Sequence, residues 1–339
     1  MIKILRYLVF LALGISIIWW FQRDLNPTEK AEISTSFEGI NYWILSGGVL
    51  LCLASHFLRA LRWNLLLKSM HYNPPLALSF MSVLIAYFAN LALPRIGEVL
   101  RCGILQRYDK VPLLKSLGTV IIERMIDVIL FLMAFGLALF LEFKYLEKYV
   151  MNELAKGLHS SEEWLFIIPY ILVGSLLLFF ALCWIYKKHK HKILTHPLFL
   201  KLKKILIGFW EGIISLKNLQ NPCLFVAYSL GIWLFYWLSL YLIFLAMPNI
   251  GLIPGSVVLT CLVMGTFGYM ITPGGVGLYP VIISATFAIF GLSKMAGYTA
   301  AWVAWSSQTM LFIVLGLASL IIIPIFYDNK SKKAKIKRN

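Results

Sequence analysis

Two breaks in the long apolar runs of this sequence constrain its fold more than any other feature. The first falls within residues 90–101 and the second within residues 272–277, and each combines proline with glycine. On either side of both breaks the apolar stretch is too short for a comfortable membrane crossing, which needs about 20 residues. Backbone leaves the helix at bilayer depth only where it is buried in protein or faces a wet cavity, because lipid offers no hydrogen-bond partner. Paired breaks therefore indicate a substrate site.

The composition settles the class of protein. Hydrophobic residues make up 60% of the chain and are gathered in several long runs, so we expect an all-α polytopic membrane protein. The formal net charge is +16. The positive residues cluster beside the predicted spans, where they set orientation and attract anionic lipid headgroups. Membrane lipids are therefore the expected partners, and nucleic-acid binding is not expected.

Hydropathy and charge predict about six full spans and two broken hairpins. The spans cover approximately residues 7–21, 42–61, 115–141, 164–186, 222–247 and 295–324. A full crossing over residues 76–93 would place Arg95 and Arg101 outside, which contradicts the positive-inside rule. A re-entrant hairpin over residues 76–107, with its turn at Pro94, keeps both of its ends in the cytoplasm.

The second hairpin, over residues 254–290, has two interpretations. It is either re-entrant like the first or a pair of short crossings around an inside turn, and both give the same final orientation. Residues 1–141 and 142–324 repeat the same order of elements and begin on opposite sides of the membrane. This order predicts an inverted-topology repeat within a single integral membrane domain over residues 1–339.

The remaining segments predict the location of the chain. Residues 196–220 are expected to form an amphipathic helix on the cytoplasmic surface, and residues 325–339 a basic cytoplasmic tail. Both termini are then cytoplasmic, and the expected location is the cytoplasmic membrane of a bacterium. No metal or cofactor is expected, because no cluster of metal ligands with recognisable spacing is present. The sequence leaves open whether the chain forms an oligomer.

Charged residues at the first break and on the following span are the main candidates for substrate binding. With one neighbouring amide they comprise Asn90, Arg95, Glu98, Arg101, Glu123, Arg124 and Asp127. Those on the hairpin recur every three residues and so share roughly one helix face. Glu123 lies about eight residues into its span, roughly 12 Å at the helical rise. At that depth each charge costs several kcal/mol unless it is paired or faces a wet cavity.

Two compatible interpretations follow for these charges. In one they form internal ion pairs, such as Arg101 with Glu123 or Arg124 with Glu98, that hold the hairpin against the span. In the other the acids orient arginines whose donors hold a lipid phosphate, which suits the bidentate geometry of guanidinium.

The glycine-rich turn is the second candidate site. Its members are Pro273, Gly274, Gly275 and Gly277. Glycines let two backbones approach closely, so the turn serves either helix packing or contact with an anionic headgroup. His56, Arg59 and Gln308 are secondary candidates, since such residues in spans more often form interfacial or interhelical bonds than bind a ligand.

At these residues the chain resembles the flippase-like membrane region of bacterial lysylphosphatidylglycerol synthases and its stand-alone relatives. The resemblance covers nearly the whole chain. It lies in three motifs, which are Asn90…Leu93-Pro94-Arg95…Gly97-Glu98…Arg101, Glu123-Arg124…Asp127 and Pro273-Gly274-Gly275…Gly277. The resemblance implies a membrane region that moves an aminoacylated phospholipid between leaflets, while a separate soluble domain makes that lipid.

Two differences limit what the resemblance implies. The chain ends at Asn339, soon after the last predicted span, so an aminoacyl-transferase domain and lipid aminoacylation are not expected. Family members often have an acid or a histidine just after the glycine turn, where this chain has Tyr279-Pro280. Any substrate or proton handling at that position is therefore not expected here.

We expect a lipid transporter or flippase that binds an anionic phospholipid or an isoprenoid-phosphate lipid at the paired broken helices. Stand-alone proteins similar to this one are associated with several lipids, so the resemblance does not identify the cargo. One alternative is an intramembrane lipid-modifying enzyme with Glu123 or Asp127 as general base, but no nucleophile lies beside a base. Another is a non-transporting scaffold for a lipid-modifying partner.

Overall fold

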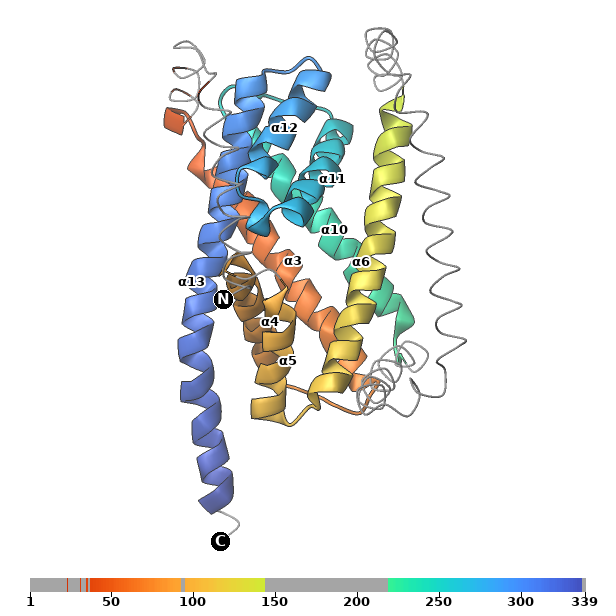
Figure 1. The fold of residues 1–339 in the computed structure, drawn as a ribbon, viewed down its shortest axis with the longest axis vertical. Coiled ribbons are helices and arrows are strands. Elements are labelled where there is room, and N and C mark those ends of the chain that lie inside the picture. Colours follow the sequence, from red (N-terminus) through yellow and green to blue (C-terminus); the bar gives the residue numbers. More distant parts are fainter. Residues whose placement is uncertain are drawn as a thin grey trace, which may run out of the picture.

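The computed structural model describes residues 37–92, 95–143 and 219–336, together with positions 23, 31 and 35. Within these ranges the chain forms eight α-helices and one short 3-10 helix, and no strand (Figure 1). This agrees with the predicted all-α class. The predicted spans at 7–21 and 164–186 and the predicted amphipathic helix lie outside the described residues, apart from the end of that helix at positions 219 and 220.

Four helices are long and apolar enough to cross a membrane. They are α3 (Tyr42–Lys68), α6 (Leu113–Leu141), α10 (Pro222–Leu245) and α13 (Lys294–Ile336), the last of them apolar as far as Tyr327. They correspond to four of the six predicted spans. Helix α13 continues through Pro324, so the first part of the predicted basic tail extends this helix.

The two predicted breaks are both present as helical hairpins. The first pairs α4 (Leu76–Ala92) with α5 (Ile96–Asp109), and the second pairs α11 (Gly255–Ile271) with α12 (Leu278–Ile289) through the 3-10 turn η1 (Pro273–Gly275). Helix α12 has 12 residues, or roughly 18 Å at the helical rise, whereas the hydrocarbon core is about 30 Å thick. Pro94, the predicted turn of the first hairpin, lies outside the described residues.

The hairpins approach each other tip to tip. In Figure 1 the α4–α5 hairpin lies in the lower half of the bundle and the α11–α12 hairpin in the upper half, and η1 contacts α4. Helix α13 packs against both α4 and α12, while α6 packs against α5 and α11, and α3 packs most extensively against α10. Residues from several helices therefore converge at the middle of the bundle.

Small residues decide where the helices approach closely. A Cβ atom at Gly48 of α3 would lie 2.9 Å from Ile243 Cγ1 on α10, and the Ser239 hydroxyl donates to the Gly48 carbonyl at 2.8 Å. A Cβ at Gly97 of α5 would overlap the backbone of Ala86 on α4. Lipid tails are as apolar as leucine, so packing and hydrogen bonds hold membrane helices together more than burial from water does.

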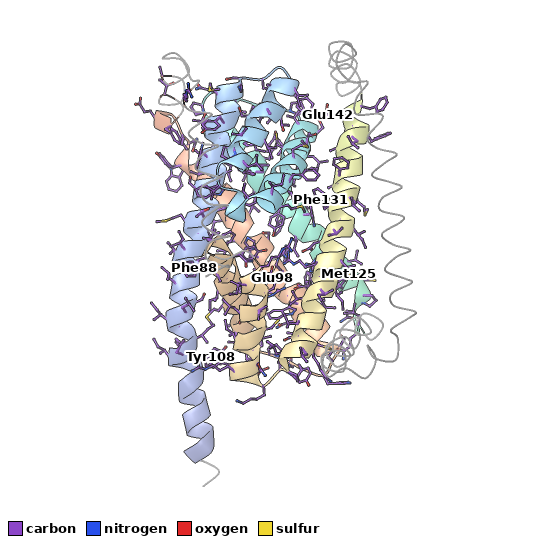
Figure 2. The ribbon with its side chains drawn as sticks, in the orientation of Figure 1. Phe88, Glu98, Tyr108, Met125, Phe131 and Glu142 are labelled. Carbon is purple, nitrogen blue, oxygen red and sulfur yellow. The ribbon has the colours of Figure 1, made fainter. Side chains whose placement is uncertain are left out.

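The polarity of the bundle is reversed relative to a soluble domain. Helix α6 exposes large apolar side chains along its length, among them Met125, Val128, Leu132 and Phe140. Its buried face includes Glu123, which is fully enclosed. Figure 2 shows Glu98 of α5 at about the level of Met125 of α6. An apolar exterior around a charged interior is expected where the solvent is hydrocarbon.

Candidate functional site

The charged interior is an arginine–carboxylate cluster made by three helices, which we call the charged core. It consists of Arg59 and Arg62 from α3, Arg101 from α5, and Glu123 and Asp127 from α6. The ion pairs join Arg101 Nη2 to Glu123 Oε2 at 2.6 Å, Arg62 Nη2 to Asp127 Oδ1 at 2.8 Å and Arg59 Nη1 to Asp127 Oδ2 at 3.1 Å. The predicted pair of Arg101 with Glu123 is confirmed.

Helix α10 orients the two arginines of α3. Arg59 Nη2 donates to the Tyr236 hydroxyl at 3.1 Å, and Arg62 Nη1 donates to Ser229 Oγ at 3.3 Å. Arg62 Nε also lies 3.6 Å from Glu123 Oε1. Arg62 therefore forms ion pairs with both carboxylates.

An aromatic side chain positions the third arginine. The Arg101 guanidinium lies 4.5 Å from the centre of the Trp63 ring, which is a cation–π contact. Trp63 Nε1 in turn donates to Thr119 Oγ1 at 2.9 Å, which fixes the ring between α3 and α6. Arg101 is thus held from two sides, by Glu123 and by Trp63.

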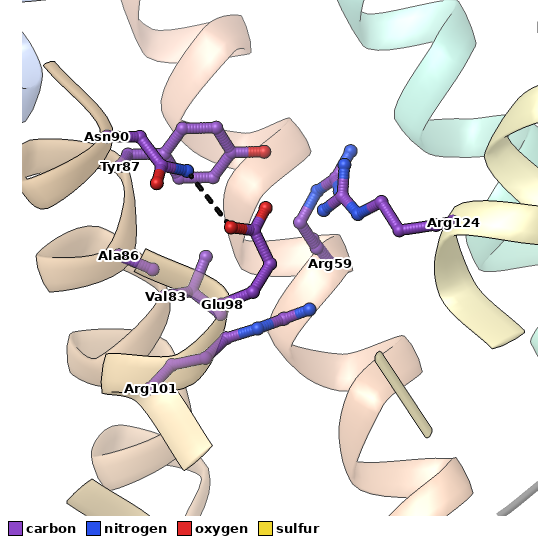
Figure 3. Close-up of a pocket in the computed structure, with 8 residues that line it drawn as sticks. All are labelled: Arg59, Val83, Ala86, Tyr87, Asn90, Glu98, Arg101 and Arg124. Carbon is purple, nitrogen blue, oxygen red and sulfur yellow. Dashed lines mark hydrogen bonds between the residues drawn. The ribbon is translucent and has the colours of Figure 1, made fainter. Parts of the chain in front are cut away.

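A narrow cleft with room for about one water molecule lies beside the charged core. Its walls are Arg59, Val83, Ala86, Tyr87, Asn90, Glu98, Arg101 and Arg124, from four helices. Figure 3 shows the Glu98 carboxylate and the guanidinium groups of Arg59 and Arg124 pointing toward the same space. Four of the predicted residues line the cleft, namely Asn90, Glu98, Arg101 and Arg124, together with the secondary candidate Arg59. A fifth predicted residue, Asp127, does not line the cleft but pairs with Arg59.

The predicted pair of Arg124 with Glu98 is wrong. Arg124 Nη1 lies 3.7 Å from Asp127, one turn further along its own helix, and the Arg124 side chain is 45% exposed. Within the described part of the chain, Glu98 receives only a long hydrogen bond from Asn90, at 3.5 Å. Arg124 reaches the carboxylate of its own helix because the cleft separates it from Glu98.

Asn90 has a positioning role. Its Oδ1 accepts a hydrogen bond from the Gly97 backbone at 2.8 Å, while its Nδ2 donates to Glu98. The first backbone N–H groups of a helix lack intrahelical partners, so this bond satisfies one of them at the start of α5. Asn90 thereby ties the end of α4 to the start of α5 across the turn.

Arg95 does not share the environment of Arg101. It stands immediately before α5 with a φ of 68°, in the left-handed region, and is exposed, whereas Arg101 is buried. The predicted common face is therefore wrong for this pair, because α5 begins only at Ile96. Arg95 is also absent from the walls of the cleft.

The glycine turn lies against α4 and α13. Gly274, Gly275 and Gly277 all have φ values between 64° and 75°, which glycine adopts at little cost. Trp305 Nε1 donates to the Gly274 carbonyl at 2.6 Å, and a Cβ atom at Gly274 would lie 3.8 Å from Leu91 Cδ2 of α4. Among the described residues, no hydrogen bond or ion pair joins this turn to the charged core.

The residues that follow the glycine turn serve packing. Tyr279 and Pro280 are both buried, and Tyr279 covers the glycines of α11. A Cβ atom at Gly268 would lie 3.0 Å from the Tyr279 backbone. The position where relatives often have an acid or histidine thus contributes to the α11–α12 contact in this chain.

Arg62 is the member of the charged core that sequence reasoning missed. It lies at the inner end of a predicted span, where positive charges are expected for orientation alone. Arg62 follows Arg59 by three residues, so both lie on one face of the helix, and this spacing could have identified Arg62 from the sequence. Arg62 is nevertheless fully buried and contacts both carboxylates.

The other secondary candidates, His56 and Gln308, are not among the walls of the cleft. His56 is buried against the rings of Tyr87 and Phe312, with centroids 4.3 and 5.0 Å away, and lies 3.7 Å from Cys52 Sγ. Gln308 of α13 is half-buried. In residues 37–92, 95–143 and 219–336, no group of three or more metal-ligating side chains could hold a metal ion.

The core and cleft together hold more positive than negative charge. Four arginines, Arg59, Arg62, Arg101 and Arg124, face the three carboxylates of Glu98, Glu123 and Asp127. Within the described residues, the buried Nε atoms of Arg59 and Arg101 have no hydrogen-bond partner. Such an arrangement is suited to binding an anion with several oxygen acceptors, because guanidinium groups offer paired donors.

These features define a polytopic helical membrane protein with a charged site between its helices. The family model for the lysylphosphatidylglycerol synthase TM region matches residues 4–316, so the chain belongs to this family. A UPF0104 membrane protein of Methanocaldococcus jannaschii is 24% identical over 326 residues, which cover 91% of this chain and 92% of that protein. No solved structure matches the chain.

Proposed function

We propose that this protein binds the phosphate group of an anionic membrane lipid in the cleft beside the charged core and moves that lipid between leaflets. The main support is the excess of arginine over carboxylate around this cleft in a member of this family. A buried charge without a partner is costly, so an anionic ligand there would be stabilised by donors that protein carboxylates leave unused. The cargo class is an anionic phospholipid or an isoprenoid-phosphate lipid.

The backbone at Arg95 gives further support. A non-glycine residue in the left-handed region costs roughly 1–2 kcal/mol, and glycine would avoid this cost. Strained residues of this kind cluster at ligand sites, where the surroundings maintain them. Arg95 stands at the start of α5, one helical turn before Glu98 of the cleft, and we propose that its guanidinium meets the headgroup as it enters.

The helix contacts support the inverted repeat. The order long helix, hairpin, long helix occurs in α3 to α6 and again in α10 to α13. Helix α4 packs on α13 as α11 packs on α6, and the two first helices, α3 and α10, pack on each other. We propose that both hairpins are re-entrant, enter from opposite faces and meet near the midplane, as in transporters with a central site.

The charge distribution supports an orientation. The open end of the α4–α5 hairpin lies near several cations, namely Lys68, Arg107, Lys110 and Lys115. By the positive-inside rule, we propose that this end faces the cytoplasm, with both chain termini on the same side. For a bacterial chain the membrane would be the cytoplasmic one.

The alternatives have less support. A general base must be able to take a proton, but Glu123 and Asp127 are each held by buried arginines. This disfavours an intramembrane enzyme. A passive scaffold does not account for unused guanidinium donors at the cleft, and it predicts that removal of these charges leaves lipid binding unchanged.

The test is lipid binding by purified protein in detergent, measured by native mass spectrometry with dioleoyl phosphatidic acid. The variant combines Arg95→Gly with Arg124→Gln, which removes two exposed cations and leaves Arg59, Arg62 and Arg101 in place with their carboxylates. Each charge-assisted hydrogen bond is worth about 1.5–3 kcal/mol. We therefore expect the affinity to fall by roughly tenfold or more.

The control combines Lys68→Gln with Lys110→Gln, which removes the same charge from exposed positions outside the cleft. The control should bind as the wild type does. Equal lipid affinity in the arginine variant and the control would contradict the proposal. Reconstitution with a fluorescent phospholipid and an impermeant quencher then tests movement between leaflets.

A further inference from the structure

A second cleft lies between α6, α10 and α11, and it differs in chemistry from the first. It is an open groove with a volume of about 340 Å³, and its walls are almost entirely apolar, with Leu137, Leu141, Trp233, Trp237, Leu259 and Leu262 among them. The indole nitrogen of Trp237 is already used, since it donates to the Gly255 carbonyl at 2.9 Å. We call this cleft the apolar groove.

A layer of aromatic rings lies between the apolar groove and the charged core. Phe131 of α6 is buried, and its ring centre lies 5.3 Å from that of Phe267 on α11 and 6.2 Å from that of Trp233 on α10. Figure 2 shows Phe131 on α6 above the level of Glu98. Trp233 lines the groove, so the layer forms its floor.

The aromatic layer contacts residues of both sites. The ring of Trp233 lies 6.4 Å from that of Tyr236, whose hydroxyl accepts the hydrogen bond from Arg59. On α6, Asp127 of the charged core is followed one turn later by Phe131 and then by Ala134, a groove residue. Groove and charged core therefore lie in sequence along the same faces of α6 and α10.

We infer that the apolar groove binds a hydrocarbon chain of the lipid whose phosphate engages the arginines, an inference that rests on the proposed function. On α6 the groove extends from Ala134 to Leu141, a helical rise of roughly 10 Å, whereas one leaflet contributes about 15 Å of hydrocarbon. The groove thus accompanies a lipid chain along about two thirds of its path through one leaflet. Its walls offer dispersion contacts and, beyond the bonds already made inside the protein, little that is polar.

The experiment compares two phosphatidic acids that differ only in chain length, dioleoyl and dihexanoyl, by native mass spectrometry of the full chain. Ala134→Trp fills the groove from α6, and Leu259→Trp fills it from α11 if the first variant does not fold. The expected result is at least a fivefold loss of affinity for the dioleoyl lipid with unchanged affinity for the dihexanoyl lipid. The matched control is Leu132→Trp, which adds the same ring at an exposed position of α6 and should change neither affinity.

Two results would overturn the inference. Unchanged dioleoyl affinity in a folded groove variant would show that the groove is not occupied by a chain of bound lipid. Equal loss of both lipids would show that the substitution acts on the headgroup site. Failure of the proposed function is a separate result, because it appears as unchanged binding of both lipids in the Arg95→Gly, Arg124→Gln variant.

Discussion

At the scale of single residues, Glu123 is the group on which the buried charges depend most. It lies 2.6 Å from Arg101 and 3.6 Å from Arg62, and all three side chains are enclosed. A buried ion pair is weak evidence for net stability, but removal of one partner leaves the other charge uncompensated. The charged core thus acts as a structural element that also orients the cleft arginines.

The substitution Glu123→Gln is expected to lower the free energy of unfolding by about 3–5 kcal/mol. The cause is the uncompensated charge on Arg101 and Arg62. The measurement is unfolding in detergent, followed by tryptophan fluorescence. Glu98→Gln is the matched control, because Glu98 forms no ion pair within the described residues, and it should cost less than about 1 kcal/mol. Equal destabilisation by both substitutions would contradict the assigned role of Glu123.

Glu98→Gln is itself a test of the proposed ligand. The Glu98 carboxylate points into the cleft toward Arg59 and Arg124, where it opposes the binding of an anion (Figure 3). Removal of a unit charge several ångströms from a phosphate is expected to raise the affinity for dioleoyl phosphatidic acid by about two- to tenfold. Titration of lipid against the variant measures this directly. A weaker affinity would mean that Glu98 contacts the headgroup as an acceptor.

At the scale of elements, the α4–α5 hairpin depends on a close crossing of its helices. Gly97 packs against the backbone of Ala86, and the Asn90 side chain bonds the Gly97 N–H at 2.8 Å. Both contacts hold the start of α5 against α4, and this determines where Glu98 and Arg101 point. The geometry of the cleft is therefore a property of the hairpin.

Gly97→Ala is expected to destabilise the protein by about 1–3 kcal/mol, because its Cβ has no space and the helices must move apart. Gly103→Ala, in the same helix, is the control. Among the described residues, nothing apart from the backbone of its own helix lies within 4 Å of a Cβ at that position, so this substitution should stabilise the protein by about 0.5–1 kcal/mol. Thermal unfolding of the two variants beside the wild type measures the difference. Gly97→Ala should lower the melting temperature and Gly103→Ala should raise it. A lower melting temperature in both variants would contradict this prediction.

At the scale of the whole molecule, the two hairpins meet tip to tip between long helices. This arrangement lets a polar site form in the middle of the bundle while apolar side chains cover the outside of α6. The charged core lies in this interior, and the apolar groove follows it along the outer surface of α6, α10 and α11. A lipid that binds both would have its phosphate near the hairpin tips and one chain along α6.

Re-entrance of the first hairpin predicts a labelling pattern in a variant whose own cysteines have been replaced. An impermeant maleimide should label His71→Cys from one side of the membrane and Leu252→Cys from the other. When the maleimide is added from the side that labels Leu252→Cys, Arg95→Cys at the hairpin tip should react more slowly than Leu252→Cys. Equal rates from that side would show that α4 and α5 cross the membrane fully.

The sequence alone determined the helical class, four of the long spans and the positions of both breaks. These features follow from hydropathy, from proline and glycine, and from local charge, all of which act within a few residues. The family resemblance was also readable from the three motifs, and the match over residues 4–316 confirms it.

Only the tertiary structure decided which charges meet. Arg59 bonds Asp127 across 68 residues and Tyr236 across 177, and Arg62 joins the same carboxylate. Arg124 stays with Asp127 on its own helix, away from Glu98. The physical reason is that such pairs depend on the rotation and crossing of whole helices, which are determined by close contacts such as Gly48 with Ile243 and Gly97 with Ala86.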